Sequence, residues 1–293
     1  MIPLGREFWK MSGSGNDFVF VDTREMPAGP LTSPEVVGAI CSRGTGIGAD
    51  GICFLEESDR ATLRLVYLNA DGSRADLCGN ATLCTARLAR ELGVIEGGEF
   101  AVDTDSGVLG ARFRGENPEI DLQPVTDVRP DAGIPMAEGE RRIGFALAGV
   151  PHLVILVDDL HRVDVVGRGR PLRRHPSLEA GANVNFVQPA GNGLFRYRTY
   201  ERGVEAETLA CGTGAVATAM LLTEWGLAKG PVRIQTRSGR ELGVRFSGQA
   251  ASRRPSLTGE ARIVYRGHFG ELPGFTPEFS PSAAAVNAPS QAV

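Results

Sequence analysis

The sequence predicts an α+β protein made of two pseudo-symmetric, strand-rich halves, each with a central helix headed by a cysteine. One observation is a repeat: six short pieces recur in the same order along the chain, which indicates an internal duplication. In both copies a cysteine precedes a turn of small residues and a run of helix formers. A third observation is the 38 glycines in 293 residues, about twice the usual share of roughly 7%, which favours many tight turns.

The first half divides into elements in the following order. A strand is expected at residues 18–22 (FVFVD), and a helix at residues 31–44, with Ser33 as its N-cap and Pro34 at its first position. Residues 46–55 (GIGADGICFL) indicate a glycine turn into a strand, and residues 61–68 a further strand. Residues 76–93 then place Cys78 before an amphipathic helix that Gly93 closes.

The second half repeats this order around residues 207–226 (ETLACGTGAVATAMLLTEWG). Cys211 lies 15 residues before Gly226, as Cys78 lies 15 residues before Gly93. A Thr-x-Ser-Gly turn follows each cysteine, at residues 104–107 and 236–239. The other matching pieces are residues 16–22 with 151–158, 48–55 with 181–188, 67–69 with 199–201, and the Arg-Phe pairs at 112–113 and 245–246.

These repeats set the expected domains. Residues 1–124 and 258–271 form the first half, residues 125–257 form the second, and residues 272–293 are a flexible tail rich in Pro, Ala and Ser. Prolines place the junction near residues 118–135. Residues 258–269 (TGEARIVYRGHF) are expected to form a strand that returns to the first half.

Composition excludes several classes of function. A net charge of −4 gives no reason to expect nucleic acid or an anionic membrane as a partner. No apolar run reaches the roughly 18 residues that a membrane span needs, and the N-terminal residues lack the apolar core of a signal peptide. We therefore expect a cytoplasmic protein whose five cysteines are thiols. Two lysines, Lys10 and Lys229, leave few candidates for Schiff-base chemistry.

The two repeated cysteines are the candidate reactive groups. The first N–H groups of a helix have no internal partner, so they favour a thiolate and can hold a carboxylate. If the halves pack about a pseudo-twofold axis, Cys78 and Cys211 face each other across the interface. One thiolate would then remove the α-proton of a small acid, and the other thiol would deliver a proton to the opposite face.

Other interpretations of the cysteines remain open at this point. A cysteine before a helix is often a packed small residue, and two such cysteines can also form a disulfide. Metal binding is disfavoured, because the chain has no Cys-x-x-Cys pair and only four histidines. Cys41, Cys53 and Cys84 lack the glycine turn and are expected to be core residues.

At these residues the sequence resembles the diaminopimelate epimerase family. The resemblance covers roughly residues 8–270 and rests on the segments KMSGSGNDFVFVD, GIGADG, NADGSRADLCGN, PHLVILVDD, YERGVEAETLACGTGA and TGEARIVY, in that order. It implies two domains, each a β-barrel-like sheet around a central helix, that close over an amino-acid substrate. It also implies a cofactor-independent isomerase that acts in lysine and cell-wall precursor biosynthesis.

The resemblance also implies residue roles. Cys78 and Cys211 would be the acid–base pair, with His152 and Glu201 tuning the thiols and the substrate amine. Arg202 would grip the distal carboxylate, and Tyr265 would lie in the interface of a homodimer. The other substrate-binding residues would be Asn16, Asn69, Gly79, Asn80, Asn183, Glu201, Gly212 and Thr213.

Some positions depart from the family pattern. Val150 stands where the family commonly has Asn, and valine cannot hydrogen-bond the distal end of a diamino diacid. Ala81, Leu83 and Gly51 replace a usual Gly, a usual Arg and a Gln of some members. Glu201 lies ten residues before Cys211, one more than in some members, so residues 204–206 are expected in a loop.

Three hypotheses follow. The first is epimerisation of LL-diaminopimelate to the meso form. The second is the same chemistry on another amino acid, motivated by Val150; proline and hydroxyproline rank low, because those relatives carry His where this chain has Asn80. The third is a binding or redox protein in which the cysteines form a reversible disulfide.

Overall fold

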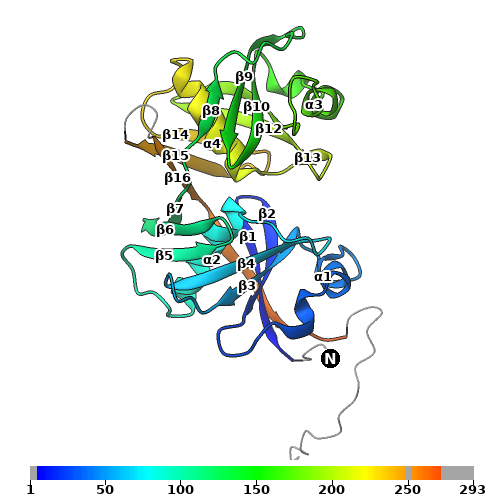
Figure 1. Ribbon diagram of the computed structural model, residues 1–293, viewed down its shortest axis with the longest axis vertical. Coiled ribbons are helices and arrows are strands. Elements are labelled where there is room, and N and C mark those ends of the chain that lie inside the picture. The colour runs from blue at the N-terminus through cyan, green and yellow to red at the C-terminus, as the bar shows by residue number, and fades with distance from the viewer. Residues whose placement is uncertain (1–4, 249–252, 272–293) are drawn as a thin grey trace, which may run out of the picture.

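The computed structural model describes residues 5–248 and 253–271, and the predicted tail at 272–293 lies outside these ranges. Figure 1 shows two lobes that meet at a waist where β7 and β16 lie. The first lobe contains β1 (Glu7–Gly13), β2 (Asn16–Asp22), α1 (Pro34–Cys41), β3 (Gly51–Glu56), β4 (Leu63–Asn69), α2 (Gly79–Glu91), β5 (Phe100–Thr104), β6 (Gly107–Arg114) and β7 (Asn117–Asp121). A 3₁₀ turn at Gly29–Thr32 precedes α1.

The second lobe repeats this order. It contains β8 (Thr126–Arg129), β9 (Glu140–Ala148), β10 (Val150–Val157), α3 (Val165–Arg173), β11 (Asn183–Gly191), β12 (Leu194–Glu201), β13 (Ala206–Thr208), α4 (Gly212–Glu224), β14 (Val232–Gln235), β15 (Glu241–Ser247), β16 (Arg254–Gly259) and, returning to the first lobe, β17 (Ala261–His268). A 3₁₀ turn at Leu160–Arg162 precedes α3.

The strand pairing has the same pattern in both lobes. From β1 to β7 the successive neighbours pair antiparallel, parallel, antiparallel, parallel, antiparallel and antiparallel. The series β9, β10, β11, β12, β14, β15 and β16 has the same six relations. The predicted fold class, two pseudo-symmetric halves around central helices, is therefore confirmed.

The two lobes also exchange strands. After β7 the chain crosses over, and β8 pairs with β9 of the second lobe. After β16 it crosses back, and β17 pairs antiparallel with β1 along its whole length. The strand expected at residues 258–269 thus forms beside the first lobe. Where the lobes meet, β16 pairs with β7.

The sequence suggested that prolines from Pro118 onwards break the strand pattern at this junction. In the structure Pro118 lies within a strand and does not interrupt it. Pro118 and Pro255 each occupy the second position of their strand, β7 and β16. In each strand the first residue that pairs with the other strand follows the proline: Glu119 pairs with Thr258, and Ser256 pairs with Asp121. A proline at the start of a strand costs no ladder hydrogen bond when its nitrogen needs no partner.

Helices α2 and α4 fill the interiors of the two lobes. Nearly every residue of both is buried, and they share one hydrophobic core with the surrounding strands. Helix α1 begins as predicted, with the Ser33 hydroxyl accepting from the N–H of Val36. Cys41, Cys53 and Cys84 are buried, as expected of core residues.

Candidate active site

A cavity of about 1090 Å³ lies between the two lobes. Its walls come from the β1–β2 turn, the segment between β4 and α2, the end of β12 and the segment before α4. The predicted site residues that line it are Asn16, Asn69, Cys78, Gly79, Asn80, Asn183, Glu201, Arg202, Cys211, Gly212 and Thr213. Residues far apart in the sequence therefore converge on one cavity.

The two cysteines occupy equivalent places. Cys78 is the N-cap of α2, with φ −129° and ψ 110°, and Cys211 is the N-cap of α4, with φ −137° and ψ 112°. Both helices have 13 residues. The backbone at the cysteine is extended in each case, which aims the following N–H groups at the cavity side of the helix.

The starts of the two helices meet. A Cβ atom placed on Gly212 would lie 3.8 Å from the Cα atom of Gly79 and 3.6 Å from Oδ1 of Asn80. These glycines directly follow Cys211 and Cys78. The two thiols thus head helices that face each other across the cavity.

Both thiols are neutral at neutral pH. Burial raises the pKa of Cys78 to about 12, against an opposing effect of the N–H groups of Ala81 and Asn80. Burial, and then the charge of Glu201, raises the pKa of Cys211 well above its usual value. The helix N–H groups lower both pKa values, as expected, but the loss of hydration on burial outweighs them.

Tyr197 fixes the backbone of Cys211. Its phenol oxygen donates to the Cys211 carbonyl and accepts from the Cys211 N–H, each at 2.7 Å. The sulfur of Cys211 accepts from the N–H of Gly214 at 3.4 Å and lies 3.5 Å from the Thr213 hydroxyl. Sequence reasoning missed Tyr197. Its buried place in the alternating strand β12 was the available signal.

Glu201 is the acidic residue of the cavity that lies beside Cys211. Burial raises the pKa of its carboxyl, and hydrogen bonding by the Thr208 hydroxyl and the Cys211 thiol opposes this. Thr208 donates directly to Oε1 of Glu201. A carboxyl group with a raised pKa beside a thiol is suited to exchange a proton with that thiol.

His152 lies behind the cavity wall and is fully buried. Burial, and then the charge of Arg202, lowers its pKa to about 3, so the imidazole is neutral. Its Nδ1 lies 3.2 Å from the side-chain nitrogen of Asn185, and its Nε2 has no hydrogen-bond partner among the described residues. Asn185, which sequence reasoning missed, also accepts from the Thr199 hydroxyl at 3.0 Å.

Polar side chains of the first lobe form a short chain of hydrogen bonds. The amide of Asn80 donates to Oδ1 of Asn16 at 2.5 Å, and the amide of Asn16 donates to Asp50 at 3.0 Å. Asn69 donates to the Ser73 hydroxyl at 3.0 Å. The cavity wall on this side is therefore held by amides that can still offer polar atoms to a ligand.

The second lobe supplies a cationic residue, Arg202. Oδ1 of Asn183 accepts from the backbone N–H of Arg202 at 2.7 Å, and the Arg202 guanidinium donates to the Ala180 carbonyl at 3.0 Å. Arg202 is one of the residues that line the cavity, and its guanidinium has no carboxylate partner among the described residues.

Equivalent turns support the two cysteines. The N–H of Ser106 donates to the carbonyl of Asp76 at 3.1 Å, and the N–H of Ser238 donates to the carbonyl of Leu209 at 3.2 Å. Asp76 and Leu209 each lie two residues before a cysteine. The duplicated Thr-x-Ser-Gly turns thus hold equivalent segments of the site.

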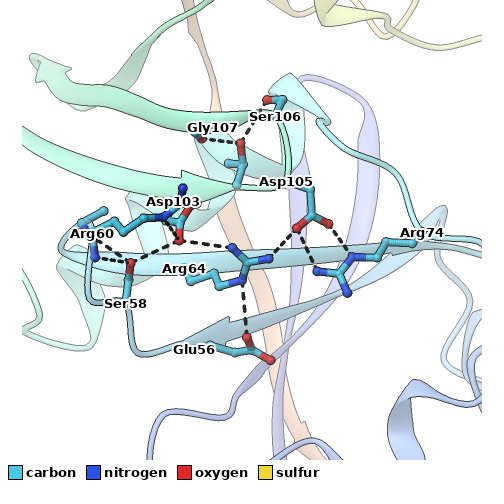
Figure 2. A network of polar contacts seen from close by, with 11 residues as sticks. Glu56, Ser58, Arg60, Arg64, Arg74, Asp103, Asp105, Ser106 and Gly107 are labelled. Atoms are coloured by element: carbon cyan, nitrogen blue, oxygen red, sulfur yellow. Dashed lines mark hydrogen bonds and ion pairs between the residues drawn. The ribbon is translucent and has the colours of Figure 1, made fainter.

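An ionic network reinforces the first of these turns (Figure 2). Arg64 lies between Asp103 and Asp105, with ion pairs of 3.1 and 2.5 Å. Arg60 pairs with Asp103, and Arg74 pairs with Asp105. Because Arg74 belongs to the segment between Asn69 and Cys78, Asp105 ties this segment to β4 and to the turn.

Among the positions that depart from the family pattern, Val150 lines the cavity. Ala81 and Leu83 are fully buried in α2. A Cβ atom on Gly51 would lie 2.5 Å from the ring of Tyr67, so the Tyr67 side chain occupies the space of any side chain there. Val204 lies in an exposed turn, as expected for the extra residue, although Ala206 already begins β13.

Tyr265 lies away from the cavity, on β17. It is 44% exposed, and its ring meets the edge of Phe8 with 6.0 Å between centroids. In the described ranges no helix is long and apolar enough to span a membrane. Over the same residues no cluster of three or more His, Cys, Asp or Glu side chains is placed to hold a metal ion.

Solved structures show which class the fold belongs to. A hydroxyproline epimerase from Agrobacterium vitis matches with a TM-score of 0.68 and 18% identity, over 91% of this chain and 92% of that one. A phenazine biosynthesis protein of the PhzF family from Bacillus anthracis matches with a TM-score of 0.70 and 14% identity, over 91% and 99%. The fold is thus one shared with racemases and epimerases.

Sequence comparison identifies the family. Residues 8–126 and 145–264 match the diaminopimelate epimerase family. The diaminopimelate epimerase of Gemmatimonas aurantiaca is 50% identical over 276 residues, which is 90% of this chain and 99% of that protein. That of Aquifex aeolicus is 38% identical over 90% and 98%. The chain belongs to the diaminopimelate epimerase family, and the predicted resemblance is confirmed.

Proposed function

We propose that this chain converts LL-2,6-diaminopimelate to meso-2,6-diaminopimelate by acid–base catalysis with two cysteines. The observation that carries this is the placement of Cys78 and Cys211 at the N-caps of two facing helices in one cavity. Two relatives that are 50% and 38% identical over nearly their whole length are both named diaminopimelate epimerase.

The proton transfers balance without any redox step. One cysteine, as thiolate, takes the α-proton, so the C–H bond breaks and an S–H bond forms. The other cysteine gives its proton to the opposite face of the same carbon. Because both thiols start neutral, one proton must leave first, and Glu201, adjacent to Cys211, is the acceptor we assign.

The helix starts stabilise the charge that develops. Removal of the α-proton places negative charge on the carboxylate of the reacting centre. The N–H groups at Gly79, Asn80, Gly212 and Thr213 begin two helices that meet at this point. Preorganised N–H donors in a site shielded from water are an effective way to lower such a barrier.

The far end of the substrate lies against polar side chains. Arg202 would hold the distal carboxylate, and Asn16, Asn69 and Asn183 would bind the remaining polar groups. His152 remains a proposed tuning residue, acting through the cavity wall and not by contact with the substrate, since it is fully buried and neutral.

A second candidate keeps the mechanism and changes the substrate. Val150 lines the cavity and offers no hydrogen bond to a distal ammonium or carboxylate. This favours turnover of another amino acid. Competitive turnover on a panel of amino acids, with the Val150→Asn variant alongside, separates the candidates: under the first, diaminopimelate is preferred and the variant still accepts it.

The deciding experiment uses LL-diaminopimelate with reduced enzyme in deuterated water. We expect deuterium at the α-carbon that inverts and accumulation of the meso form. The absence of α-exchange would refute the chemistry, whereas exchange seen only with another amino acid would select the second candidate. A binding or redox protein whose cysteines only form a reversible disulfide would exchange the α-proton of neither diaminopimelate nor another amino acid.

Assembly and location belong to the same proposal. An exposed Tyr265 on β17 supports a homodimer formed through this strand, which sedimentation of the wild type and of Tyr265→Glu would test. The division into residues 1–124 with 258–271 and residues 125–257 stays a prediction, as does the cytoplasmic location.

A further inference from the structure

Leu257 lies beneath the meeting point of the two catalytic helices. It is fully buried on β16, the strand that pairs with β15 on one side and with β7 on the other. A Cβ atom placed on Gly79 would lie 3.1 Å from Cδ2 of Leu257, and one placed on Gly212 would lie 3.0 Å from that same atom. One methyl group therefore lies next to the first residue of both helices.

We propose that Leu257 is a positioning residue that sets the separation of the Cys78 and Cys211 thiols. This proposal rests on the proposed function for its catalytic consequence. Gly79 and Gly212 each follow their cysteine directly, so a shift of either helix start carries a thiol with it. We call Leu257 the spacer. Its position is fixed, because its backbone is paired with Ile120 and Val244 on the two neighbouring strands.

The reaction makes this separation critical. Two sulfur atoms must reach opposite faces of one carbon, and a misplacement of about 1 Å can lower a rate about 100-fold. The spacer also accounts for glycine at both helix starts. A Cβ atom at either position would lie 3.0 to 3.1 Å from the Leu257 methyl group, so either this methyl group or the helix start would have to shift.

The kinetic test compares two leucine variants. Leu257→Ala should lower kcat about 100-fold with KM changed less than threefold, because binding groups remain while the thiols are misplaced. The matched control is Leu242→Ala, which empties an equally buried site of the same core beside Gly259 and not beside the helix starts. Its kcat should stay within about threefold of wild type. Leu257→Met, of similar volume, should retain most of the rate.

A distance measurement tests the proposal without relying on catalysis. A short bifunctional alkylating reagent joins two thiols only if its span matches their separation. We expect the rate of the Cys78–Cys211 cross-link, located by mass spectrometry, to change at least threefold in Leu257→Ala relative to Leu242→Ala. This readout stays valid if diaminopimelate proves not to be the substrate.

A double variant distinguishes misplacement of the thiols from a simple folding defect. Gly212→Ala adds a methyl group that presses on the Leu257 side chain, and Leu257→Ala removes that side chain. The kcat of the double variant should therefore be higher than that of Gly212→Ala alone. Equal cross-linking in the two leucine variants, or a kcat of Leu242→Ala as low as that of Leu257→Ala, would overturn the proposal.

Discussion

The hydroxyl of Ser238 donates a hydrogen bond of 2.7 Å to the carbonyl oxygen of Ser14, which lies in the other lobe. Ser14 has a positive φ of 54° and directly precedes Gly15 and the cavity residue Asn16. The N–H of Ser238 meanwhile holds Leu209, two residues before Cys211. One serine thus connects parts of the site from both lobes. Its counterpart Ser106 bonds only Thr104 through its hydroxyl within the described residues, so the pseudo-symmetry is broken here.

This connection predicts that Ser238→Ala weakens the site more than it weakens the fold. A typical hydrogen bond contributes about 1 kcal/mol, so we expect a loss of that order in the free energy of unfolding. The variant loses the hydroxyl bond to Ser14, which precedes the cavity residue Asn16, and keeps the backbone bond to Leu209. Because the position of Asn16 depends on the lost bond, kcat/KM should fall roughly tenfold. Ser106→Ala is the matched control. The connection has no role in the site if both variants keep the same kcat/KM.

Each catalytic thiol should be indispensable. Cys78→Ala and Cys211→Ala should each lower the rate of inversion by at least about 1,000-fold, because residues that act as a unit lose nearly all of their effect together. The double variant should be little worse than either single one. Near wild-type turnover by either single variant, measured with reductant present, would disprove the paired assignment.

The reactivity of Cys78 should depend steeply on pH. Its pKa is raised to about 12 by burial, so the thiolate fraction grows about tenfold for each pH unit from 7 to 9. Its rate of alkylation by iodoacetamide should rise in the same proportion and show no plateau in this range. Peptide mapping against Cys78→Ser checks the site. A plateau below pH 8 would mean that the helix N-terminus prevails over burial.

Acid should remove a stabilising contribution of Glu119. Burial alone would raise the pKa of this carboxyl, but hydrogen bonds from Ser256, Arg114 and Arg112 leave it lowered. A lowered pKa means that the contribution is present above about pH 4.5, the usual value, and is lost as pH falls through the folded-state pKa.

Urea unfolding of Glu119→Gln measures this contribution. Removing one partner of a buried ion pair costs about 3 kcal/mol, so the variant should be less stable by that order at pH 7. The difference from wild type should shrink towards pH 3. Glu116→Gln, whose carboxylate is almost fully exposed beside Arg90, serves as the control and should change stability little. A pH-independent difference would exclude the charge as its cause.

The repeat made much of this molecule predictable. Cys78 and Cys211 were matched by spacing alone, and the structure gives them nearly the same backbone angles. Helix α3 was not predicted, because Gly167, Gly169 and Pro171 lie within it, and its start depends on Asp164 accepting from the Gly167 N–H. Local signals there favour a loop, and tertiary packing overrides them.

Other features depend on contacts that no local pattern encodes. Tyr197 reaches the backbone of Cys211 from strand β12, and the fold alone brings these two residues together. The sequence indicated the effect of the helix N–H groups on the thiol pKa values but not the larger effect of burial, because burial of an N-cap side chain is a property of the whole assembly. The position of Leu257 next to both helix starts could not be predicted from the sequence either, because it depends on how the two lobes assemble.

The pairing of β1 with β17 has a consequence for how the chain is made. Residues 7–13 leave the ribosome early and must wait for residues 261–268 before their open edge is covered. An unpaired strand edge is a template for unwanted association, and domains generally fold as units during synthesis. We therefore expect the nascent first lobe to need protection during translation until nearly the whole protein has been synthesised.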